Sequence, residues 1–248
     1  MHSRFEEDLS VYATLANRRF GCDEAGRLSQ YPGSDAHAAP RFYFGRTVQG
    51  NLWRFSADVP RNVLIDLARW AGLERPLDRG GSSRLAPPPL PERWPHILAR
   101  LGADPLVGFG SAWAVLKPSD GGLWGPSSVG RVLRLNAGNV RMLGKEFAHA
   151  RNAAMRGAVC FVKLLDGEVV SSCHTQCDRA SGETELEVFT PEAYRGSGHA
   201  RDVLWHWVES VRREGGVPVA RSSWEDDSFL QFARRSGFKL WGEDRLIF

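Results

Sequence analysis

The second half of the chain alternates hydrophobic and polar positions in short runs that end in clear turns. Two apolar runs, over residues 158–165 and 168–175, flank an Asp-Gly pair, which is typical of a tight β-hairpin because both residues tolerate positive φ. Alternation over residues 183–190 predicts a further strand, and Pro191 ends it because proline has no N–H to donate to a ladder. These runs predict an antiparallel meander.

The apolar positions that follow have helical spacing. From Ala200 to Val211 they recur every three or four residues and predict one inward face. The charged residues are expected on the outer face: Arg201, Asp202, Glu209, Arg212 and Arg213.

A turn with almost no side chains, Arg195-Gly196-Ser197-Gly198, lies between this strand and this helix. Free N–H groups at a helix start, together with the helix dipole, form an anion site. Arg195 adds a fixed positive charge beside it. The sequence therefore predicts a ligand that carries phosphates.

Other elements follow from the same patterns and from glycine and proline positions. Helices are expected over the first 15 residues and over 58–72, 94–101, 136–143 and 227–235. Strands are expected over 41–48, 52–55, 106–116, 132–135 and 217–220, with a terminal hairpin of 238–241 and 245–248. The proline- and glycine-rich segment 79–91 is expected to be a linker or exposed loop.

Composition narrows the class of protein. The chain has 248 residues, 42% of them hydrophobic and 25% charged, as in ordinary soluble proteins. A net charge of +3 without a dense basic block gives no reason to expect nucleic acid as a partner. No apolar run approaches the ~18 residues of a membrane span. Four cysteines in so long a chain suggest reduced thiols in a cytoplasmic protein.

Two motifs carry a resemblance to a known family. The spacing Arg195-x-x-Gly198-x-Ala200 resembles the acetyl-coenzyme A pyrophosphate loop of the GCN5-related N-acetyltransferase (GNAT) superfamily, Gln/Arg-x-x-Gly-x-Gly/Ala. A P-loop would need a lysine after the glycines, and a dinucleotide fold a third glycine. Without a family motif, the same turn would simply precede a core helix.

The second motif, over residues 222–238, is similar to a segment of an uncharacterised bacterial GNAT subgroup. The matching residues are Ser222, Trp224, Ser228, Ala233 and Gly237. Ser223 stands in place of threonine and Asp226 in place of the usual asparagine.

The resemblance implies an α/β (α+β) architecture, in which helices flank a mixed, mostly antiparallel sheet. It covers an acetyltransferase domain over residues 130–248. Residues 1–125 form a smaller α+β region of unassigned role, which could cover the acceptor or mediate a homodimer.

The resemblance further implies transfer of an acetyl group from acetyl-coenzyme A to a primary amine of a small molecule or peptide. The amine would attack directly within a ternary complex, without a metal. An N–H near Val188 would polarise the thioester carbonyl. The residues expected to bind acetyl-coenzyme A are Val188, Phe189, Thr190, Arg195, Gly196, Ser197, Gly198, His199 and Ala200.

The residues that accept and donate protons are assigned less directly than those that bind the cofactor. A base must take the amine's proton, and Glu185 and Glu187 both qualify; Glu185 is favoured because the subgroup has an acidic residue there. A salt-bridged strand face is an almost equal alternative. Where the family often has a tyrosine as general acid the chain has Ala233, so Ser228, Ser223 or water would substitute, or the thiolate would leave unassisted.

Alternative functions are weaker. In Cys173-His174-x-x-Cys177 the first two residues point to opposite faces of a strand, which argues against a metal site. No Gly-x-Ser-x-Gly elbow supports a hydrolase. The second hypothesis is a non-catalytic module that binds acyl-coenzyme A or a partner and has lost efficient chemistry, as the missing tyrosine permits.

Overall fold

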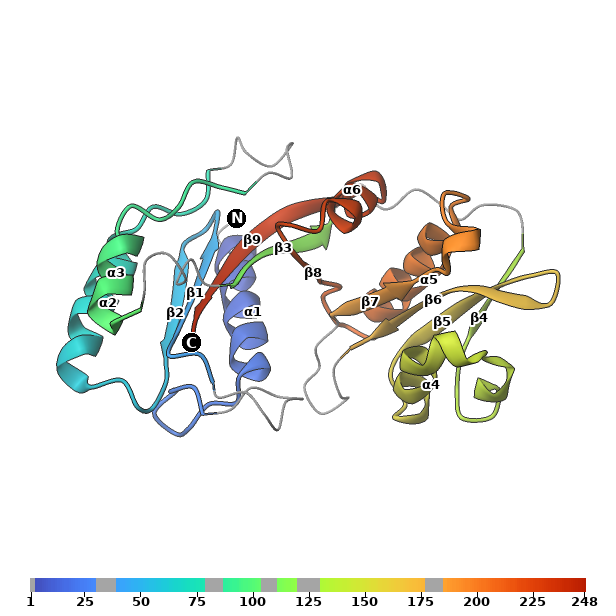
Figure 1. Cartoon of the computed structure of the whole chain (residues 1–248), viewed down its shortest axis with the longest axis horizontal. Helices are drawn as coiled ribbons and strands as arrows, with labels where there is room; N and C mark the ends of the chain where they lie inside the picture. The colour runs from blue at the N-terminus through green and yellow to red at the C-terminus, as the bar shows by residue number, and fades with distance from the viewer. Residues whose placement is uncertain (1–2, 30–38, 79–86, 104–110, 120–129, 177–184) are drawn as a thin grey trace. The chain divides into compact units, whose positions relative to one another are not determined.

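The computed structural model describes all residues except 1–2, 30–38, 79–86, 104–110, 120–129 and 177–184 (Figure 1). Internal contacts divide the chain into two compact units. Unit 1 comprises Met1–Val115, Ser222–Gln231 and Leu240–Phe248, and unit 2 comprises Leu116–Arg221 and Phe232–Lys239. Segments after residue 220 thus belong to both units, and the expected division into regions 1–125 and 130–248 stays a prediction.

Unit 1 is built around a sheet that has helices on both faces. Its elements are α1 (Ser3–Arg19), β1 (Phe42–Thr47), β2 (Asn51–Phe55), α2 (Arg61–Leu73) and α3 (Trp94–Leu101). Four elements have residues in both units: β3 (Ser111–Pro118), β8 (Ala220–Ser223), α6 (Asp227–Arg235) and β9 (Phe238–Ile247). The five-stranded sheet has the order β2-β1-β9-β3-β8, and β1 is antiparallel to both β2 and β9.

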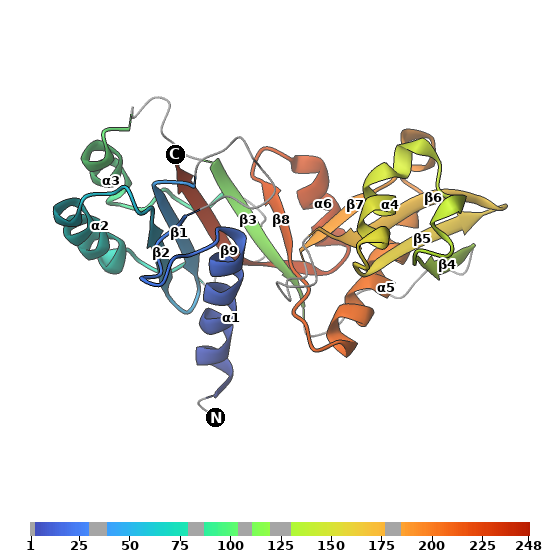
Figure 2. The same cartoon turned by 90° about the horizontal axis from the view of Figure 1, so that it is seen from below.

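The period of two along β1 sorts its side chains between these faces. Phe42 and Phe44 are buried in a cluster with Leu67 of α2 and Trp94 of α3. Tyr43 packs instead in a cluster with residues of α1. Figures 1 and 2 show the corresponding arrangement, with α1 on one face of β1 and β9 and with α2 and α3 on the other.

Unit 2 contains a second sheet, of four strands in the order β4-β5-β6-β7, with every neighbouring pair antiparallel. Its strands are β4 (Arg131–Arg134), β5 (Cys160–Leu165), β6 (Glu168–Thr175) and β7 (Leu186–Phe189). Its helices are η2 (Val140–Met142), η3 (Lys145–Phe147), α4 (Ala148–Met155), η5 (Glu192–Tyr194) and α5 (His199–Arg213).

Helices α4 and α5 lie on opposite faces of this sheet (Figure 2). On the α4 face, Val162 of β5 is buried against Phe147 and Ala150. On the α5 face, the Trp207 indole N–H donates to Thr175 Oγ1 of β6 over 3.1 Å.

Most predicted elements are confirmed, and so is the fold class of helices flanking mostly antiparallel sheets. Helix α3 has the predicted bounds and ends at Gly102, whose φ of +67° is left-handed. The hairpin of β5 and β6 turns at Asp166 and Gly167, both with positive φ.

Two predicted elements are wrong, and the strand expected over 217–220 lies at Ala220–Ser223 instead. The helix expected over 136–143 is a loop with one 3-10 turn, because side chains compete for its backbone: Asn136 Oδ1 accepts from Gly138 N and Asn139 Oδ1 from Asn136 N, each over 2.8 Å. The α-helix lies later, at Ala148–Met155. The expected terminal hairpin is the single strand β9, in which Gly242 continues the ladder opposite Thr47.

Candidate functional site

Strand β7 is paired along one edge and largely open along the other. Gln176 N donates to Glu185 O over 2.8 Å on the β6 side, and Leu186 N donates to Val219 O over 3.0 Å on the opposite side. Backbone groups of an antiparallel strand alternate between its two edges, so the N–H and C=O of Val188 point to the same side as those of Leu186. Among the described residues, the Val188 N–H has no hydrogen-bond partner there.

The glycine turn follows β7 after the short 3-10 helix η5. After η5, Gly196 and Gly198 both have a φ of +81°, and Gly198 is the N-cap of α5 without a side-chain capping bond. A Cβ at either glycine would meet nothing within 4 Å, so the backbone angle, and not crowding, requires glycine. The predicted strand–turn–helix order is confirmed.

The start of α5 leaves two amides without a partner. The N–H groups of Arg201 and Asp202 donate to Gly198 O, over 3.1 and 3.3 Å. Those of His199 and Ala200 have no acceptor in the described part of the chain. Such orphan amides at the positive end of a helix are suited to an anion.

Side chains around the turn tie it to the β5–β6 hairpin. Tyr194 Oη donates to Glu168 Oε2 over 2.9 Å, which raises the pKa of Tyr194 above 10. The Thr190 and Ser171 hydroxyls are hydrogen-bonded over 2.8 Å. Arg195 is exposed and its Nε donates to Thr190 O over 3.1 Å.

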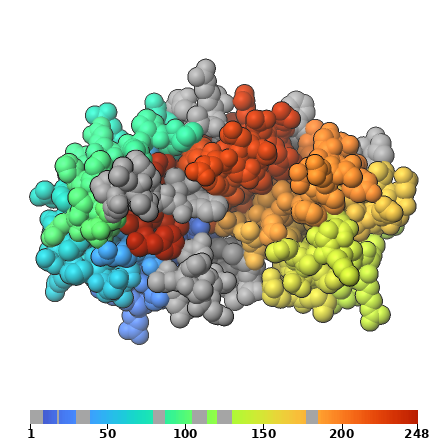
Figure 3. Space-filling view, viewed as in Figure 1, coloured from blue at the N-terminus to red at the C-terminus, as the bar shows by residue number. Residues whose placement is uncertain are grey.

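The exposed surface of the turn is suited to a ligand from solution. Gly196 and Ser197 are exposed, and orange atoms of the segment around residue 195 reach the surface in the space-filling view (Figure 3). Phe189, in contrast, packs its ring 5.4 Å from that of Phe147 and belongs to the core under α4. Its predicted contact with the cofactor would therefore have to be through its backbone.

A buried polar group lies behind the turn. His199 is 7% exposed, and its Nδ1 has no partner among the described residues. Burial, and then the charge of Lys163, lower the pKa of His199 below 6.5, while Asp202 opposes them. The role of His199 as a backbone donor at the helix start stays a prediction.

Lys163 and Asp202 form an ion pair that the sequence analysis missed. Lys163 Nζ contacts Asp202 Oδ2, and both side chains are only 1% exposed. Asp202 was expected on the outer face of α5, and this is wrong. The available signal was Lys163 itself, a lone charge within the apolar run of β5.

The two candidate bases have different surroundings. Glu185 Oε2 lies 2.6 Å from Nη1 of Arg221, in a salt bridge with side chains 16% and 3% exposed. Glu187 is 32% exposed, and its oxygens lie 3.8 Å from His149 Nδ1 and 3.6 Å from His174 Nε2. Both of the latter distances exceed those of a hydrogen bond.

The environment of His174 sets its charge. Burial lowers the pKa of His174 below 6.5; Glu187 raises it, and His149 and Arg156 lower it further. His174 Nδ1 is buried without a partner among the described residues. Burial thus favours the neutral form of His174, which faces Glu187 across the β6–β7 pair.

The second motif forms a capped helix. Asp226 Oδ1 accepts from Phe229 N over 3.0 Å, which caps α6. Ser228 is exposed in the first turn of α6 and belongs to unit 1, whereas the glycine turn belongs to unit 2. Ala233, where the family often has tyrosine, is buried.

Two further features concern metals and membranes. In the part of the chain that the structure describes, no three His, Cys, Asp or Glu side chains are grouped as metal ligands; Cys177 lies outside it. Burial raises the pKa of Cys160 to about 12 and that of Cys173 well above 9.

None of the described helices combines the length and the apolar character of a membrane span.

Comparisons with known proteins concern the fold. No protein-family model matches the chain. No curated protein matches it. Solved structures that are similar to the chain include acetyltransferases of the GNAT family, the superfamily that the two motifs resemble.

Three of these structures illustrate the likeness. A putative GNAT acetyltransferase from Novosphingobium aromaticivorans is 17% identical, over 55% of this chain and 63% of that one, with a TM-score of 0.42. A GNAT-like protein from Streptococcus suis is 13% identical, over 98% and 99%, with a TM-score of 0.43. A GCN5-related N-acetyltransferase from Kribbella flavida is 17% identical, over 62% of both chains, with a TM-score of 0.44. The chain thus spans less than two thirds of the first and third proteins.

Proposed function

We propose that the protein is an N-acetyltransferase, which moves an acetyl group from acetyl-coenzyme A to a primary amine of a small molecule or peptide. One observation carries this proposal: the open edge of β7 at Val188 leads through η5 into a glycine turn that opens a helix. Acetyl-coenzyme A has an extended pantetheine arm joined to a diphosphate. The open strand edge would bind the arm, and the glycine turn would bind the diphosphate.

Three parts of acetyl-coenzyme A would have matching groups in unit 2. The pantetheine arm pairs with the open edge of β7 as an added strand would. The diphosphate accepts hydrogen bonds from the amides of the turn and of His199 and Ala200, beside Arg195. The Val188 N–H polarises the thioester carbonyl and stabilises the oxyanion as the amine attacks.

The base is proposed to be Glu187. An amine substrate arrives protonated, because its pKa lies well above neutrality, so a carboxylate must accept the proton directly or through water. Glu187 has only loose contacts with His149 and His174, which leave its oxygens available. Glu185 is instead held by Arg221 at 2.6 Å, so its oxygen Oε2 is already occupied.

The leaving thiolate needs a proton. At the position where the GNAT superfamily often has a tyrosine as general acid, this chain has Ala233. Water would supply the proton, and the predicted roles of Ser228 and Ser223, which belong to unit 1, stay predictions from the sequence. This gap keeps a second function in view, a non-catalytic module that binds acyl-coenzyme A on the same edge and turn.

Release of free thiol from acetyl-coenzyme A across a panel of primary amines tests the proposal. The wild type is expected to turn over at least one amine. Glu187→Gln should lower kcat by about 10²-fold or more and leave the KM for acetyl-coenzyme A unchanged, because it removes only the proton acceptor.

Glu185→Gln is the matched control, two residues away. It should lower kcat less than Glu187→Gln does. Binding of coenzyme A without turnover of any amine would favour the non-catalytic module, and absence of binding would overturn both functions.

A further inference from the structure

The buried ion pair of Lys163 and Asp202 lies behind the start of α5. Lys163 comes from the middle of β5, and Asp202 from the first turn of α5, where its N–H donates to the N-cap residue Gly198. The same turn carries the two orphan amides of His199 and Ala200. The pair and the proposed diphosphate site therefore share one helical turn.

The position of Asp202 is unfavourable for that site. A carboxylate in the first turn stabilises an isolated helix, but it also opposes any other anion at the same end. With both side chains 1% exposed, little water screens the Asp202 charge. An anion site on this turn requires a nearby compensating cation, and Lys163 is that cation.

The charge of Lys163 also acts on the first residue of the helix. After burial, Lys163 is the strongest influence that lowers the pKa of His199, and Asp202 acts in the opposite direction. Gly130 packs closely against the stem of Lys163, since a Cβ there would lie 2.9 Å from Lys163 Cε. The Lys163 side chain is 1% exposed, so its ammonium group does not extend into solvent.

Stability alone does not explain the pair. Replacing a buried ion pair by apolar residues of similar volume is often neutral or stabilising, because both charges lose their hydration. A helix that binds no anion could have an apolar residue at position 202, as it has at Val203 and Leu204. A role at the anion site would account for both charges being kept.

We propose that Lys163 is a positioning residue for the diphosphate of acetyl-coenzyme A. By neutralising Asp202 it keeps the start of α5 electropositive, and the ion pair holds that turn against β5. This inference rests on the proposed function and deepens it, since it names the residue that makes the helix start selective for a diphosphate.

Calorimetric titration of the full chain with coenzyme A, and with pantetheine, which has no diphosphate, tests this. Lys163→Met leaves Asp202 without its cation. It should weaken coenzyme A binding roughly ten-fold, as one unit charge within about 10 Å does at an effective dielectric of about 20, and leave pantetheine binding unchanged.

Asp202→Asn is the informative counterpart. It removes the opposing charge and should keep or raise the ratio of coenzyme A to pantetheine affinity. The double variant Lys163→Met/Asp202→Asn should restore that ratio to near the wild-type value. A merely structural pair would instead give equal losses for both single variants, for both ligands.

The outcomes separate the two levels of the proposal. If wild-type protein binds coenzyme A but Lys163→Met keeps the affinity ratio, or Asp202→Asn lowers it as strongly, the role of Lys163 is overturned and the proposed function stands. If the wild type binds no coenzyme A, both fail. Circular dichroism identifies a variant that does not fold; should Lys163→Met be one, the ratio for Asp202→Asn decides.

Discussion

A carboxylate of unit 1, Glu243, and a carboxylate of unit 2, Glu187, have opposite surroundings. In unit 1, both oxygens of Glu243 are occupied: Oε2 by Arg46 at 3.0 and 2.5 Å, and Oε1 by Arg245 at 2.5 Å. In unit 2, the carboxylate of Glu187 lies 3.6 Å from His174 Nε2 and 3.8 Å from His149 Nδ1, and the amides of Val188, His199 and Ala200 have no partner among the described residues. Saturated groups hold a fold together, whereas unsaturated ones are available for a ligand.

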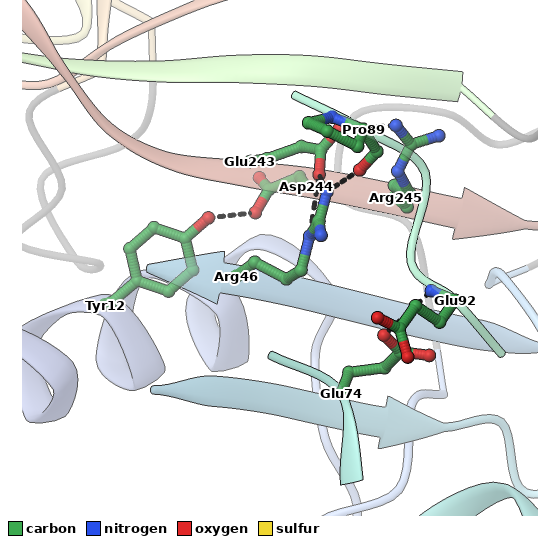
Figure 4. Close-up of polar contacts among 8 residues, drawn as sticks. All are labelled: Tyr12, Arg46, Glu74, Pro89, Glu92, Glu243, Asp244 and Arg245. Atoms are coloured by element: carbon green, nitrogen blue, oxygen red, sulfur yellow. Dashed lines mark hydrogen bonds and ion pairs between the residues drawn. The ribbon is translucent and has the colours of Figure 1, made fainter. Parts of the chain in front are cut away.

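Asp244, next to Glu243 on β9, extends this network to the other face of the sheet. Its Oδ1 accepts from Tyr12 over 2.5 Å and from Tyr43 over 2.7 Å. Figure 4 shows Tyr12 pointing at Asp244, while Arg46 bridges Glu243 and the carbonyl of Pro89. The polar groups of unit 1 therefore join α1, β1, β9 and the segment before α3, which is a structural role.

The largest expected effect comes from breaking the unit 1 network. Glu243→Gln leaves the charges of Arg46 and Arg245 buried without their carboxylate and should lower the free energy of unfolding by about 3–5 kcal/mol. Urea denaturation measures this loss. Glu92→Gln is the control in the same unit, because its ion pair with Arg75 is exposed, and it should change stability by about 0–1 kcal/mol.

Glu187→Gln sharpens the contrast, since the same chemical change in unit 2 should reduce turnover with little loss of stability. Equal destabilisation by Glu243→Gln and Glu187→Gln would contradict the assignment of a structural role to Glu243 and a functional role to Glu187.

A smaller effect is expected at the glycine turn. Gly198→Ala places an alanine at a φ of +81° and should cost about 1–2 kcal/mol of stability. It should also weaken coenzyme A binding, because relief of the strain moves the amides of the turn.

Gly215→Ala provides the match at the other end of the same helix. Gly215 has a φ of +80° and equally open space around a Cβ. The Gly215→Ala variant should lose a similar amount of stability and should keep the wild-type affinity for coenzyme A. Parallel losses of affinity in both variants would show that the turn has no special role.

The smallest expected effect is a pH dependence of unit 2. Burial lowers the folded-state pKa of His174, His199 and His206 below 6.5, so below pH 6.5 the unfolded chain binds more protons than the folded one. Stability should therefore be complete above about pH 6.5 and fall as the pH decreases toward the folded-state values. Urea midpoints between pH 7.5 and 5.5 should show this decline, and His174→Gln should make it shallower. An unchanged decline in that variant would exclude His174 as a source.

The sequence predicted the elements whose determinants are local. The Asp166-Gly167 hairpin, the end of α3 at Gly102 and the turn from β7 to α5 all depend on backbone angles that glycine or aspartate permits. The glycine spacing also identified the candidate ligand site, because orphan amides are a property of any helix start.

Features that depend on distant partners were missed or wrong. Gly242-Glu243-Asp244 suggested a turn, yet these residues continue β9 because their partners Arg46 and Tyr12 come from about 200 positions earlier. Asp202 was predicted on the outer face of α5 because its side chain is charged. Its partner Lys163 lies 39 positions away on another element. No local pattern contains these pairings.

Amide hydrogen exchange across β7 and the glycine turn, with and without acetyl-coenzyme A, tests the central claim most directly. The account predicts that saturating cofactor slows exchange at Val188 and over residues 196–200, while residues 240–248 of unit 1 exchange as before. Unchanged exchange at Val188 and in the turn, with cofactor bound elsewhere or not at all, would contradict it.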